Sequence, residues 1–353
     1  MRSYQVTDLG QPLEQVESET PEPAGSQVLL KTIACGVCHS DVHLWHGGFD
    51  LGGGKFMSLV DRGMTLPMVM GHEPIGEVVA VGPDAEGVSI GETRLIFPWI
   101  GCGNCARCDE EHDNDCTSMR TIGVFRPGGY ADHVLAPHPK YLIDISGIDP
   151  IYGCTLACAG VTAYGALKKT LPLADDDKVV IIGAGGVGLT GVGIAPGFLE
   201  REVIVVDIED EKLRTARETG ANHAVHTINS SAGSAVEAIH DLTGGGAGAV
   251  VDFVGAPQTA QLGMDAIRKG GKYVAVGLYG GEVSLSMPLL PLRHMSLRGS
   301  YVGNLAEMRE LASLAQAGKV KALPVQTRPM SEVTRTLREL ESGDITGRVV
   351  VVP

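Results

Sequence analysis

The glycine pattern at residues 183–188 constrains the fold of this chain more than any other feature. It reads Gly-Ala-Gly-Gly-Val-Gly and directly follows an apolar stretch, residues 178–182, which predicts a β-strand. A second apolar stretch, residues 202–207, ends in Asp207. A strand, a glycine turn that opens a helix and a second strand ending in an acid are typical of the dinucleotide-binding βαβ unit. The sequence therefore predicts an α/β fold, a Rossmann doubly wound parallel sheet.

The same unit indicates the cofactor. Glycines let the backbone approach a pyrophosphate at the N-terminus of a helix. Asp207 would accept hydrogen bonds from the ribose hydroxyls and would repel a 2′-phosphate, and the next residues, Ile208 and Glu209, are not basic. We therefore predict NAD rather than NADP. The expected contacts in the glycine turn are Gly183, Gly185, Gly186, Val187 and Gly188.

Two further expectations concern this domain. Residues 189–197 contain three glycines and Pro196, which are poor helix formers, so we expect the helix after the glycine turn to stop or kink near Ala195. Residues 248–255 and 272–278 read as strands. Ligands in this fold lie beyond the carboxyl ends of the strands, so three residues are candidates to flank the nicotinamide: Val254, Gly277 and Leu278.

Composition limits the environment and the partners. The formal charge of −14 makes nucleic acid and anionic membranes poor partners. The first residues lack the apolar core of a signal peptide, and no apolar run is long enough to span a membrane. A cytoplasmic location is the default expectation. In that setting the eight cysteines favour metal ligation over disulfides.

Four of the cysteines form one cluster with C-x2-C-x2-C-x7-C spacing: Cys102, Cys105, Cys108 and Cys116. Four thiolates can close a tetrahedral shell and leave no open position, which predicts a structural zinc site. An iron–sulfur cluster and four unmetallated core cysteines are the alternatives.

A second metal site is predicted from residues farther apart. Residues 28–34 read as a strand, and Cys38 follows in a polar cluster at its end. The other candidate ligands are His72 and Cys158. Three protein ligands with a fourth position left open are typical of a catalytic zinc.

At these residues the sequence resembles the zinc-dependent medium-chain alcohol dehydrogenases, and most of all their microbial, NAD-using branch. The shared motifs are residues 36–41, 71–73, the four-cysteine cluster, 183–188 and 347–350. The resemblance implies a β-rich, GroES-like catalytic domain made of residues 1–155 and 297–353, with a Rossmann domain at 156–296. It also implies two zinc ions per chain and a homodimer or homotetramer.

The resemblance further implies a role for each residue of the site. Zinc would lower the pKa of the substrate alcohol, and NAD would accept the hydride. Ser40 and His43 would relay the proton, Asp41 would hold the imidazole of His72, and Glu73 would lie beside the metal. By resemblance, His39 and Arg348 would contact the cofactor. Ordinary surface positions are the alternatives for three of these residues: His39, His43 and Arg348.

Other assignments stay open. Cys35 and Cys154 each precede a proposed ligand, so they would either complete a second four-cysteine site or be small buried residues. Residues 47–67 form a long glycine-rich loop, which is either functional or a surface insertion. Three apolar residues, Phe49, Trp99 and Leu278, would suit medium-chain or aromatic substrates, although Trp99 would equally suit the core.

The expected reaction is oxidation of primary or secondary alcohols to aldehydes or ketones. A polyol dehydrogenase and a non-catalytic zinc-binding module are the alternatives.

Overall fold

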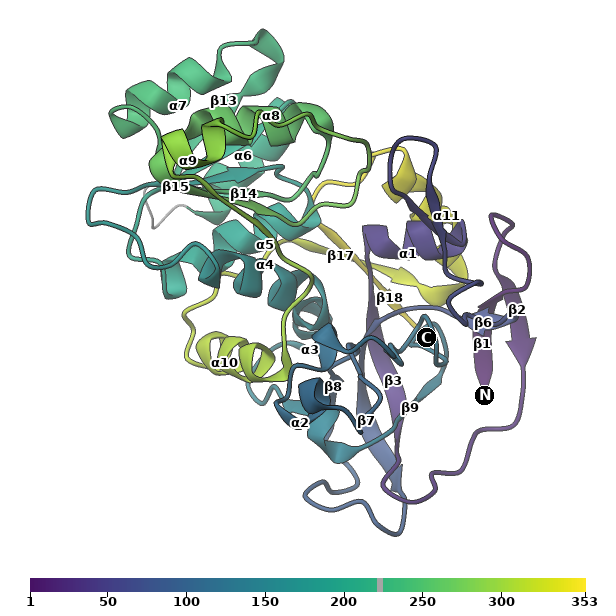
Figure 1. Cartoon of the computed structure of the whole chain (residues 1–353). Coiled ribbons are helices and arrows are strands. Elements are labelled where there is room, and N and C mark those ends of the chain that lie inside the picture. The colour runs from purple at the N-terminus through teal and green to yellow at the C-terminus, as the bar shows by residue number, and fades with distance from the viewer. Residues whose placement is uncertain (221–224) are drawn as a thin grey trace.

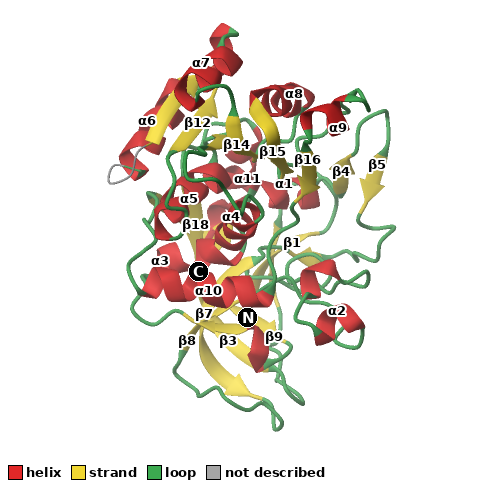
Figure 2. Cartoon of the chain, turned by 60° about the vertical axis from the view of Figure 1, so that its left-hand side comes forward, coloured by secondary structure: helices red, strands yellow, loops and turns green. Residues whose placement is uncertain are grey.

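The computed structural model describes residues 1–220 and 225–353. Figure 1 shows a helix-rich half, built from the middle of the chain, beside a strand-rich half that contains both termini. In Figure 2 helices surround the sheet of the first half, whereas long strands dominate the second. Both ends of the chain therefore contribute to one domain, and the segment between them forms the other.

The helix-rich half contains a six-stranded sheet in the order β13-β12-β11-β14-β15-β16, in which every neighbouring pair is parallel. The strands are β11 (Val179–Ile182), β12 (Val203–Asp207), β13 (Val225–Asn229), β14 (Ala247–Asp252), β15 (Ile267–Ala275) and β16 (Ser296–Gly299). The direction of connection reverses at β11, which leaves a ligand-binding crevice at the carboxyl ends of the strands. The predicted doubly wound fold is confirmed.

Helices pack on both faces of this sheet (Figure 2). They are α4 (Ala159–Lys168), α5 (Gly186–Ile194), α6 (Asp210–Thr219), α7 (Ala235–Thr243), α8 (Pro257–Ala266) and α9 (Leu289–Arg293). Helix α5 ends at Ile194 and a 3-10 turn follows at Ala195–Gly197, in agreement with the expected stop. Its glycines serve close packing, because a Cβ on Gly193 would lie 2.4 Å from the carbonyl oxygen of Lys321.

The strand-rich half is organised around a seven-stranded sheet. Its path is β10 (Leu142–Asp144), β8 (Thr93–Ile96), β7 (Glu73–Val81), β3 (Val28–Val37), β18 (Arg348–Val352) and β17 (Val325–Pro329), and β9 (His133–Ala136) also pairs with β3. The last strand of the chain, β18, thus pairs with β3, which lies near the N-terminus. The expected domain boundary at residue 297 lies inside β16, so the parallel sheet extends to Gly299.

Smaller elements complete this half. A three-stranded sheet contains β2 (Glu14–Glu17), β1 (Arg2–Val6) and β6 (Met68–Val69), and β4 (Gly48–Asp50) forms a hairpin with β5 (Phe56–Ser58) inside the long glycine-rich loop. The helices are α1 (His39–Trp45), α2 (Ala106–Asp109), α3 (Pro150–Gly153), α10 (Leu305–Gln316) and α11 (Val333–Glu341).

Over the described part of the chain, no single helix has both the length and the apolar composition to cross a membrane, although the bent pair Pro150–Ala157 and Ala159–Lys168 meets both criteria together.

One apolar core runs through both halves. It contains Leu30 and Leu95 of the antiparallel sheet, Val161 and Leu167 of α4, and Val179 of the parallel sheet, all fully buried. Burial of large apolar side chains is the main stabilising term in folding. Because this core is continuous, it fixes the ends of β3 and β7 relative to the carboxyl ends of the parallel strands.

Candidate active site

Cys38, His72 and Cys158 meet at one point, although they are far apart in the sequence. Cys38 follows β3 and precedes α1, and β3 pairs with β7 so that Gly36 lies opposite Glu73. This register brings His72 beside Cys38. Cys158 is the residue before α4. The donor atoms of the three residues all lie within 4.8 Å of one another, and the two sulfur atoms are 3.8 Å apart.

A buried carboxylate orients the imidazole of His72. Oδ1 of Asp41 lies 2.8 Å from Nδ1 of His72. Oδ2 of Asp41 accepts hydrogen bonds from the hydroxyl of Tyr130 at 2.9 Å and from the backbone N–H of Cys38 at 3.0 Å. Burial alone would lower the pKa of His72, but the nearby Asp41 carboxylate raises this pKa well above its usual value. Asp41 thus fixes which ring nitrogen faces the two thiols.

These residues fit a zinc ion. Nε2 of His72 is buried and has no hydrogen-bond partner among the described residues. Buried polar atoms are rarely left without a partner, so an unpaired nitrogen beside two thiols indicates a missing ligand. Two thiolates and one imidazole are donors that zinc prefers, and three of them leave one position open. The carboxylate behind the imidazole is the usual second support of such a site.

We expect Asp41→Asn to weaken zinc binding about 10- to 100-fold, because an amide supports the imidazole less well than a carboxylate. Competition with a chromophoric chelator measures this change. Tyr130→Phe is the matched control, since it removes one hydrogen bond to Asp41 and keeps the carboxylate, so its effect should be much smaller. Zinc held as tightly by Asp41→Asn as by the wild type would contradict the supporting role.

Ser40 and His43 lie three residues apart on α1, and both line the cavity that Cys38 and Cys158 also line. The ring of His43 is 5.0 Å from Phe49 and 5.5 Å from His39. Burial, followed by the neighbouring His39, lowers the pKa of His43. A histidine with a lowered pKa is neutral at pH 7 and can accept a proton. His39 itself is exposed at the edge of the cavity.

Glu73 and Arg348 form a buried ion pair behind the metal ligands. Nη2 of Arg348 donates to Oε2 of Glu73, and the backbone N–H of Ala159 donates to Oε1 at 3.1 Å. Burial raises the pKa of Glu73 to about 7, and the guanidinium of Arg348 opposes this rise. Only a glycine fits at position 36, because its Cβ would overlap the Glu73 carboxylate.

Arg348 also reaches the glycine turn. It is 4% exposed, which excludes the alternative of a surface arginine. A Cβ on Gly186 would lie 3.0 Å from Cδ of Arg348, so the side chain lies against the start of α5. The ion pair therefore links the metal ligands to the turn that is expected to hold a pyrophosphate.

The glycine turn is tight and closely packed against the strand before it. Gly183 has φ +90, a left-handed conformation that favours glycine. A Cβ on Gly188 would lie 1.8 Å from the carbonyl oxygen of Gly183. Asp207 ends β12, and its Oδ2 accepts from the backbone N–H of Ala184 at 2.6 Å. This carboxylate therefore lies beside the glycine turn, as ribose recognition requires.

The three residues expected beside the nicotinamide differ in position. Gly277 and Leu278 line the cavity. Val254 instead packs against Gly183, where a Cβ would lie 2.7 Å from its Cγ2, while its neighbours Phe253 and Gly255 line the cavity. β14 and β15 end at Asp252 and Ala275, three residues before the ends of the predicted strands.

Asp252 holds this part of the crevice together, and the sequence did not single it out. It is fully buried at the end of β14. Oδ1 accepts from the backbone N–H groups of Val254 at 2.8 Å and Gly255 at 3.0 Å. Oδ2 accepts from the hydroxyls of Thr259 and Tyr273, each at 2.8 Å. One carboxylate thus fixes the loop after β14, next to the cavity.

We expect Asp252→Asn to raise the dissociation constant for NADH about five- to tenfold, because an amide can accept at only one of these two positions. Quenching of protein fluorescence measures the constant. Thr259→Val, which removes one of the four donors, should have a smaller effect in the same direction. A lower melting temperature with unchanged NADH binding would show that Asp252 is only a stability residue.

The cavity has a volume of about 870 Å³ and joins the metal ligands to the carboxyl ends of the parallel strands. The ring of Trp99 is buried 5.5 Å from His72, and its Nε1 donates to the carbonyl oxygen of Ala157 at 3.2 Å. Tyr301 packs edge-on against Trp99 at 5.8 Å. The hairpin β4–β5 supplies Phe49 and Met57. The long glycine-rich loop is therefore a wall of the cavity.

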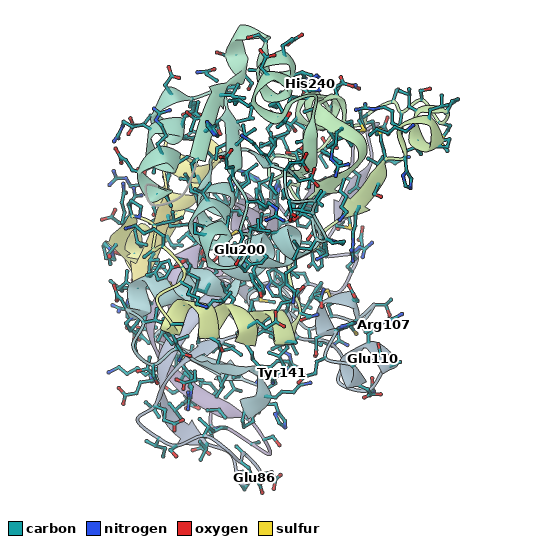
Figure 3. All side chains as sticks on the ribbon, turned by 90° about the vertical axis from the view of Figure 1, so that its left-hand side faces the viewer. Glu86, Arg107, Glu110, Tyr141, Glu200 and His240 are labelled. Carbon is teal, nitrogen blue, oxygen red and sulfur yellow. The ribbon has the colours of Figure 1, made fainter. Side chains whose placement is uncertain are left out.

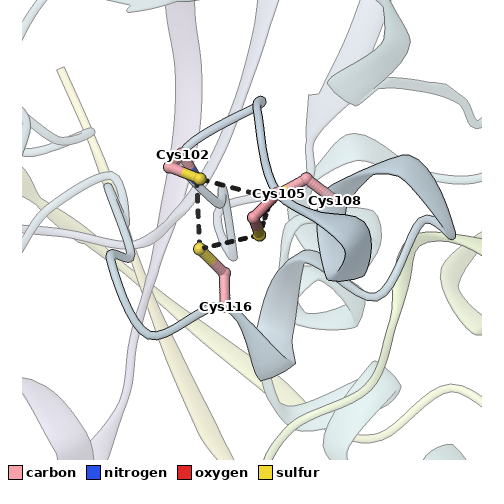
Figure 4. A group of neighbouring side chains, drawn as sticks. All are labelled: Cys102, Cys105, Cys108 and Cys116. Carbon is pink, nitrogen blue, oxygen red and sulfur yellow. Dashed lines mark hydrogen bonds between the residues drawn. The ribbon is translucent and has the colours of Figure 1, made fainter.

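The four-cysteine cluster forms a separate lobe around α2. The side chains of its cysteines point toward one another (Figure 4), and their sulfur atoms all lie within 4.8 Å. Backbone N–H groups of Gly103 and Ser118 donate to the sulfurs of Cys108 and Cys116, each at 3.4 Å. N–H groups aimed at sulfur stabilise thiolates, which is what zinc ligation needs. The lobe fits a closed structural zinc site.

The lobe is joined to the rest of the domain by a buried carboxylate. Oδ1 of Asp113 accepts from the hydroxyl of Tyr141 at 2.7 Å and from the N–H of Gly101 at 3.2 Å. In Figure 3 Arg107 and Glu110 extend from the outer side of the lobe, and these two exposed residues form an ion pair at 3.2 Å. Cys116 and the five residues that follow it, 117–121, line the cavity.

Cys35 and Cys154 do not join either metal group. Over residues 1–220 and 225–353, the only sets of donors close enough to share an ion are the two already described. Cys35 packs against Gly129, and the thiol of Cys154 donates to the carbonyl oxygen of Ile151 at 3.3 Å. Burial raises the pKa of both thiols, as expected for small core residues. The structure does not form the second four-cysteine site that the sequence left open.

Comparison with known proteins gives two family matches. The model described as "Alcohol dehydrogenase GroES-like domain" matches residues 24–147, and the model described as "Zinc-binding dehydrogenase" matches residues 186–317. Among similar proteins, an NAD-dependent alcohol dehydrogenase of Sulfurisphaera tokodaii is 37% identical over 355 residues, with all of both chains covered.

Solved structures of alcohol dehydrogenases are similar to this chain over nearly their whole length. The alcohol dehydrogenase of the hyperthermophilic archaeon Aeropyrum pernix superimposes with a TM-score of 0.88 at 29% identity, and all of both chains is covered. A cobalt- and zinc-bound thermostable alcohol dehydrogenase from Pyrobaculum aerophilum has a TM-score of 0.84 at 27% identity, covering 100% of this chain and 99% of its own.

Proposed function

The chain belongs to the zinc-dependent medium-chain alcohol dehydrogenase family, and we propose that the cavity above Cys38, His72 and Cys158 is its active site. The protein is an NAD-dependent alcohol dehydrogenase, an oxidoreductase that uses zinc and NAD. A non-catalytic zinc-binding module is thereby excluded. One observation supports the site above all: the unpaired Nε2 of His72 and two thiols converge where the cavity meets the carboxyl ends of the parallel strands.

Cys38, His72 and Cys158 would hold the catalytic zinc. When bound, zinc lowers the pKa of an alcohol hydroxyl. NAD supplies the hydride acceptor. Gly185, around which an added Cβ would meet no atom within 4 Å, would let the backbone approach the pyrophosphate, with Arg348 behind the turn. Asp207 would accept hydrogen bonds from the ribose.

Residues of the chain would transfer the proton of the substrate hydroxyl to solvent. Ser40 lines the cavity and would hydrogen-bond the substrate hydroxyl. His43, one helical turn further along α1, would pass the proton toward solvent, which its lowered pKa supports because a neutral imidazole can accept it. Trp99 and the hairpin β4–β5 would exclude water from the reacting carbon. Glu73 keeps Arg348 in position from the far side of the ligands.

We propose primary or secondary alcohols with an apolar chain or ring as substrates. The apolar walls of the cavity, which include Phe49, Trp99 and the half-exposed Leu278, support this choice. The hydroxyls of a polyol that faced these three side chains would have no hydrogen-bond partners, which is unfavourable.

We also propose that the chain forms at least a homodimer through β16. All four residues of this edge strand are exposed, and apolar side chains gather close to it: Met287, Leu289, Leu292 and Leu297. An open, apolar sheet edge is a template for pairing with a second copy. A cytoplasmic location is proposed because all eight cysteines are free and the two metal sites need six of them in the reduced form.

The test combines two measurements on protein purified without chelator: zinc content by elemental analysis, and NADH formation with primary, secondary and benzylic alcohols and a polyol. Two zinc ions per chain and turnover of simple alcohols are expected. One zinc ion and no turnover would mean that only the four-cysteine lobe binds metal, and the assigned active site would be wrong.

A further inference from the structure

Two arginines, Arg62 and Arg120, line the same cavity as the metal ligands. Both are exposed, and neither guanidinium has an ion pair or a side-chain hydrogen bond within the part of the chain that the structure describes. Each comes from a different segment: Arg62 from the turn after the β4–β5 hairpin, and Arg120 from the stretch that follows the four-cysteine lobe. Guanidinium groups without a protein partner are available to a ligand.

The backbone of each arginine is fixed while its side chain is free. The N–H of Arg62 donates to the carbonyl oxygen of Leu59 at 3.1 Å, and that oxygen also accepts from Met64 at 2.9 Å. Leu59 and Met64 are buried and anchor the turn. The N–H of Arg120 donates to the carbonyl oxygen of Ile100 at 2.7 Å, which places Arg120 beside the segment that carries Trp99.

The lining of the cavity is mixed in polarity. It includes the metal ligands and several apolar side chains: Phe49, Leu59, Trp99, Val124 and Phe125. Among the described residues that line it, Asp50 is the only acid, and Oδ1 of Asp50 accepts from the backbone N–H of Gly52 at 2.8 Å. The cavity lining thus contains two guanidinium groups and one carboxylate that is already hydrogen-bonded, in a chain whose formal charge is −14. Such local positive charge attracts anions.

We propose that the substrate is an amphipathic hydroxy acid: a hydroxyl at the metal end, an apolar spacer along the walls, and an anionic group, a carboxylate or a phosphate, bound by Arg62 and Arg120. This inference rests on the proposed function. The reaction keeps its stoichiometry: the carbinol carbon gives a hydride to NAD, its hydroxyl proton goes to solvent, and the product is the oxo acid with NADH. The anionic group does not react.

The experiment compares three substrates of equal chain length: hexanol, ω-hydroxyhexanoate and ω-hydroxyhexyl phosphate. The enzymes are the wild type, the double variant Arg62→Gln/Arg120→Gln, and the control Arg107→Gln, an exposed arginine on the outer side of the lobe. For the wild type we expect kcat/KM for one of the anions to exceed that for hexanol about tenfold, since an exposed ion pair contributes little and two add up. The anion with the higher kcat/KM shows whether the two arginines select a carboxylate or a phosphate.

In the double variant this preference should disappear while kcat/KM for hexanol changes less than about twofold, and Arg107→Gln should behave as the wild type. Added salt should reduce the preference of the wild type only. Equal kcat/KM for hexanol and both anions in the wild type, or a preference that survives in the double variant, would overturn the proposal. Both of those results include turnover of hexanol, whereas failure of the proposed function would abolish turnover of all three substrates.

Discussion

Cys158→Ala is expected to lower kcat for alcohol oxidation at least about a thousandfold, because loss of one of three ligands removes several kcal/mol of stabilisation of the developing charge. The buried His72 and Cys38 would remain, but two donors do not hold zinc as three do. Zinc content should fall from two ions per chain to one. Elemental analysis and NADH formation, measured on the same preparation, test both parts of this expectation.

The chain offers a matched control for this experiment. Cys154 is also a buried cysteine, four residues earlier, but its sulfur does not belong to the donor group. Cys154→Ala should keep both zinc ions and change kcat less than about threefold, apart from a modest loss of stability on truncation of a small core residue. A Cys158→Ala enzyme that still holds two zinc ions and turns over alcohol would refute the assignment of the catalytic ligands.

Cys116→Ser is expected to release the zinc of the lobe and lower the melting temperature by about 5–10 °C, because a structural zinc contributes its binding free energy to folding. The stretch after Cys116 lines the cavity, so KM for the alcohol should rise as well. Differential scanning calorimetry and steady-state kinetics measure the two effects. NADH binding should change little, since the cofactor crevice lies in the other half of the molecule.

Arg107→Gln again provides the control, because it lies on α2 within the same lobe and its ion pair with Glu110 is exposed. Such a pair contributes about 0–1 kcal/mol, so the melting temperature should stay nearly constant. If Cys116→Ser kept the zinc and the melting temperature of the wild type, the lobe would not be a structural metal site.

Short-range patterns carried most of what the sequence could predict. The turn at Gly183, the acid at Asp207 and the spacing of the lobe cysteines each depend on neighbours within one βαβ unit or one loop, so local rules apply to them. The end of α5 near Ala195 was predicted from neighbouring glycines and a proline, which is also a local signal, and the helix does end at Ile194.

The supporting contacts could not be predicted in the same way. Tyr130 bonds Asp41 across 89 residues, and Arg348 pairs with Glu73 across 275 residues. Nothing in the local sequence marks such partners, because tertiary packing alone brings them together. Asp252 did carry a signal, an acid at the end of an apolar strand, but that pattern also fits an ordinary turn residue.

The pairing of β18 with β3 has a consequence for how the polypeptide is made. During synthesis, β3 leaves the ribosome more than 300 residues before β18, since the two strands begin at Val28 and Arg348. The Rossmann segment is therefore complete and able to fold first, while one edge of β3 stays open. Unpaired apolar edges favour aggregation, and contacts of such long sequence separation form slowly. We therefore expect the nascent chain to bind chaperones until β18 pairs with β3.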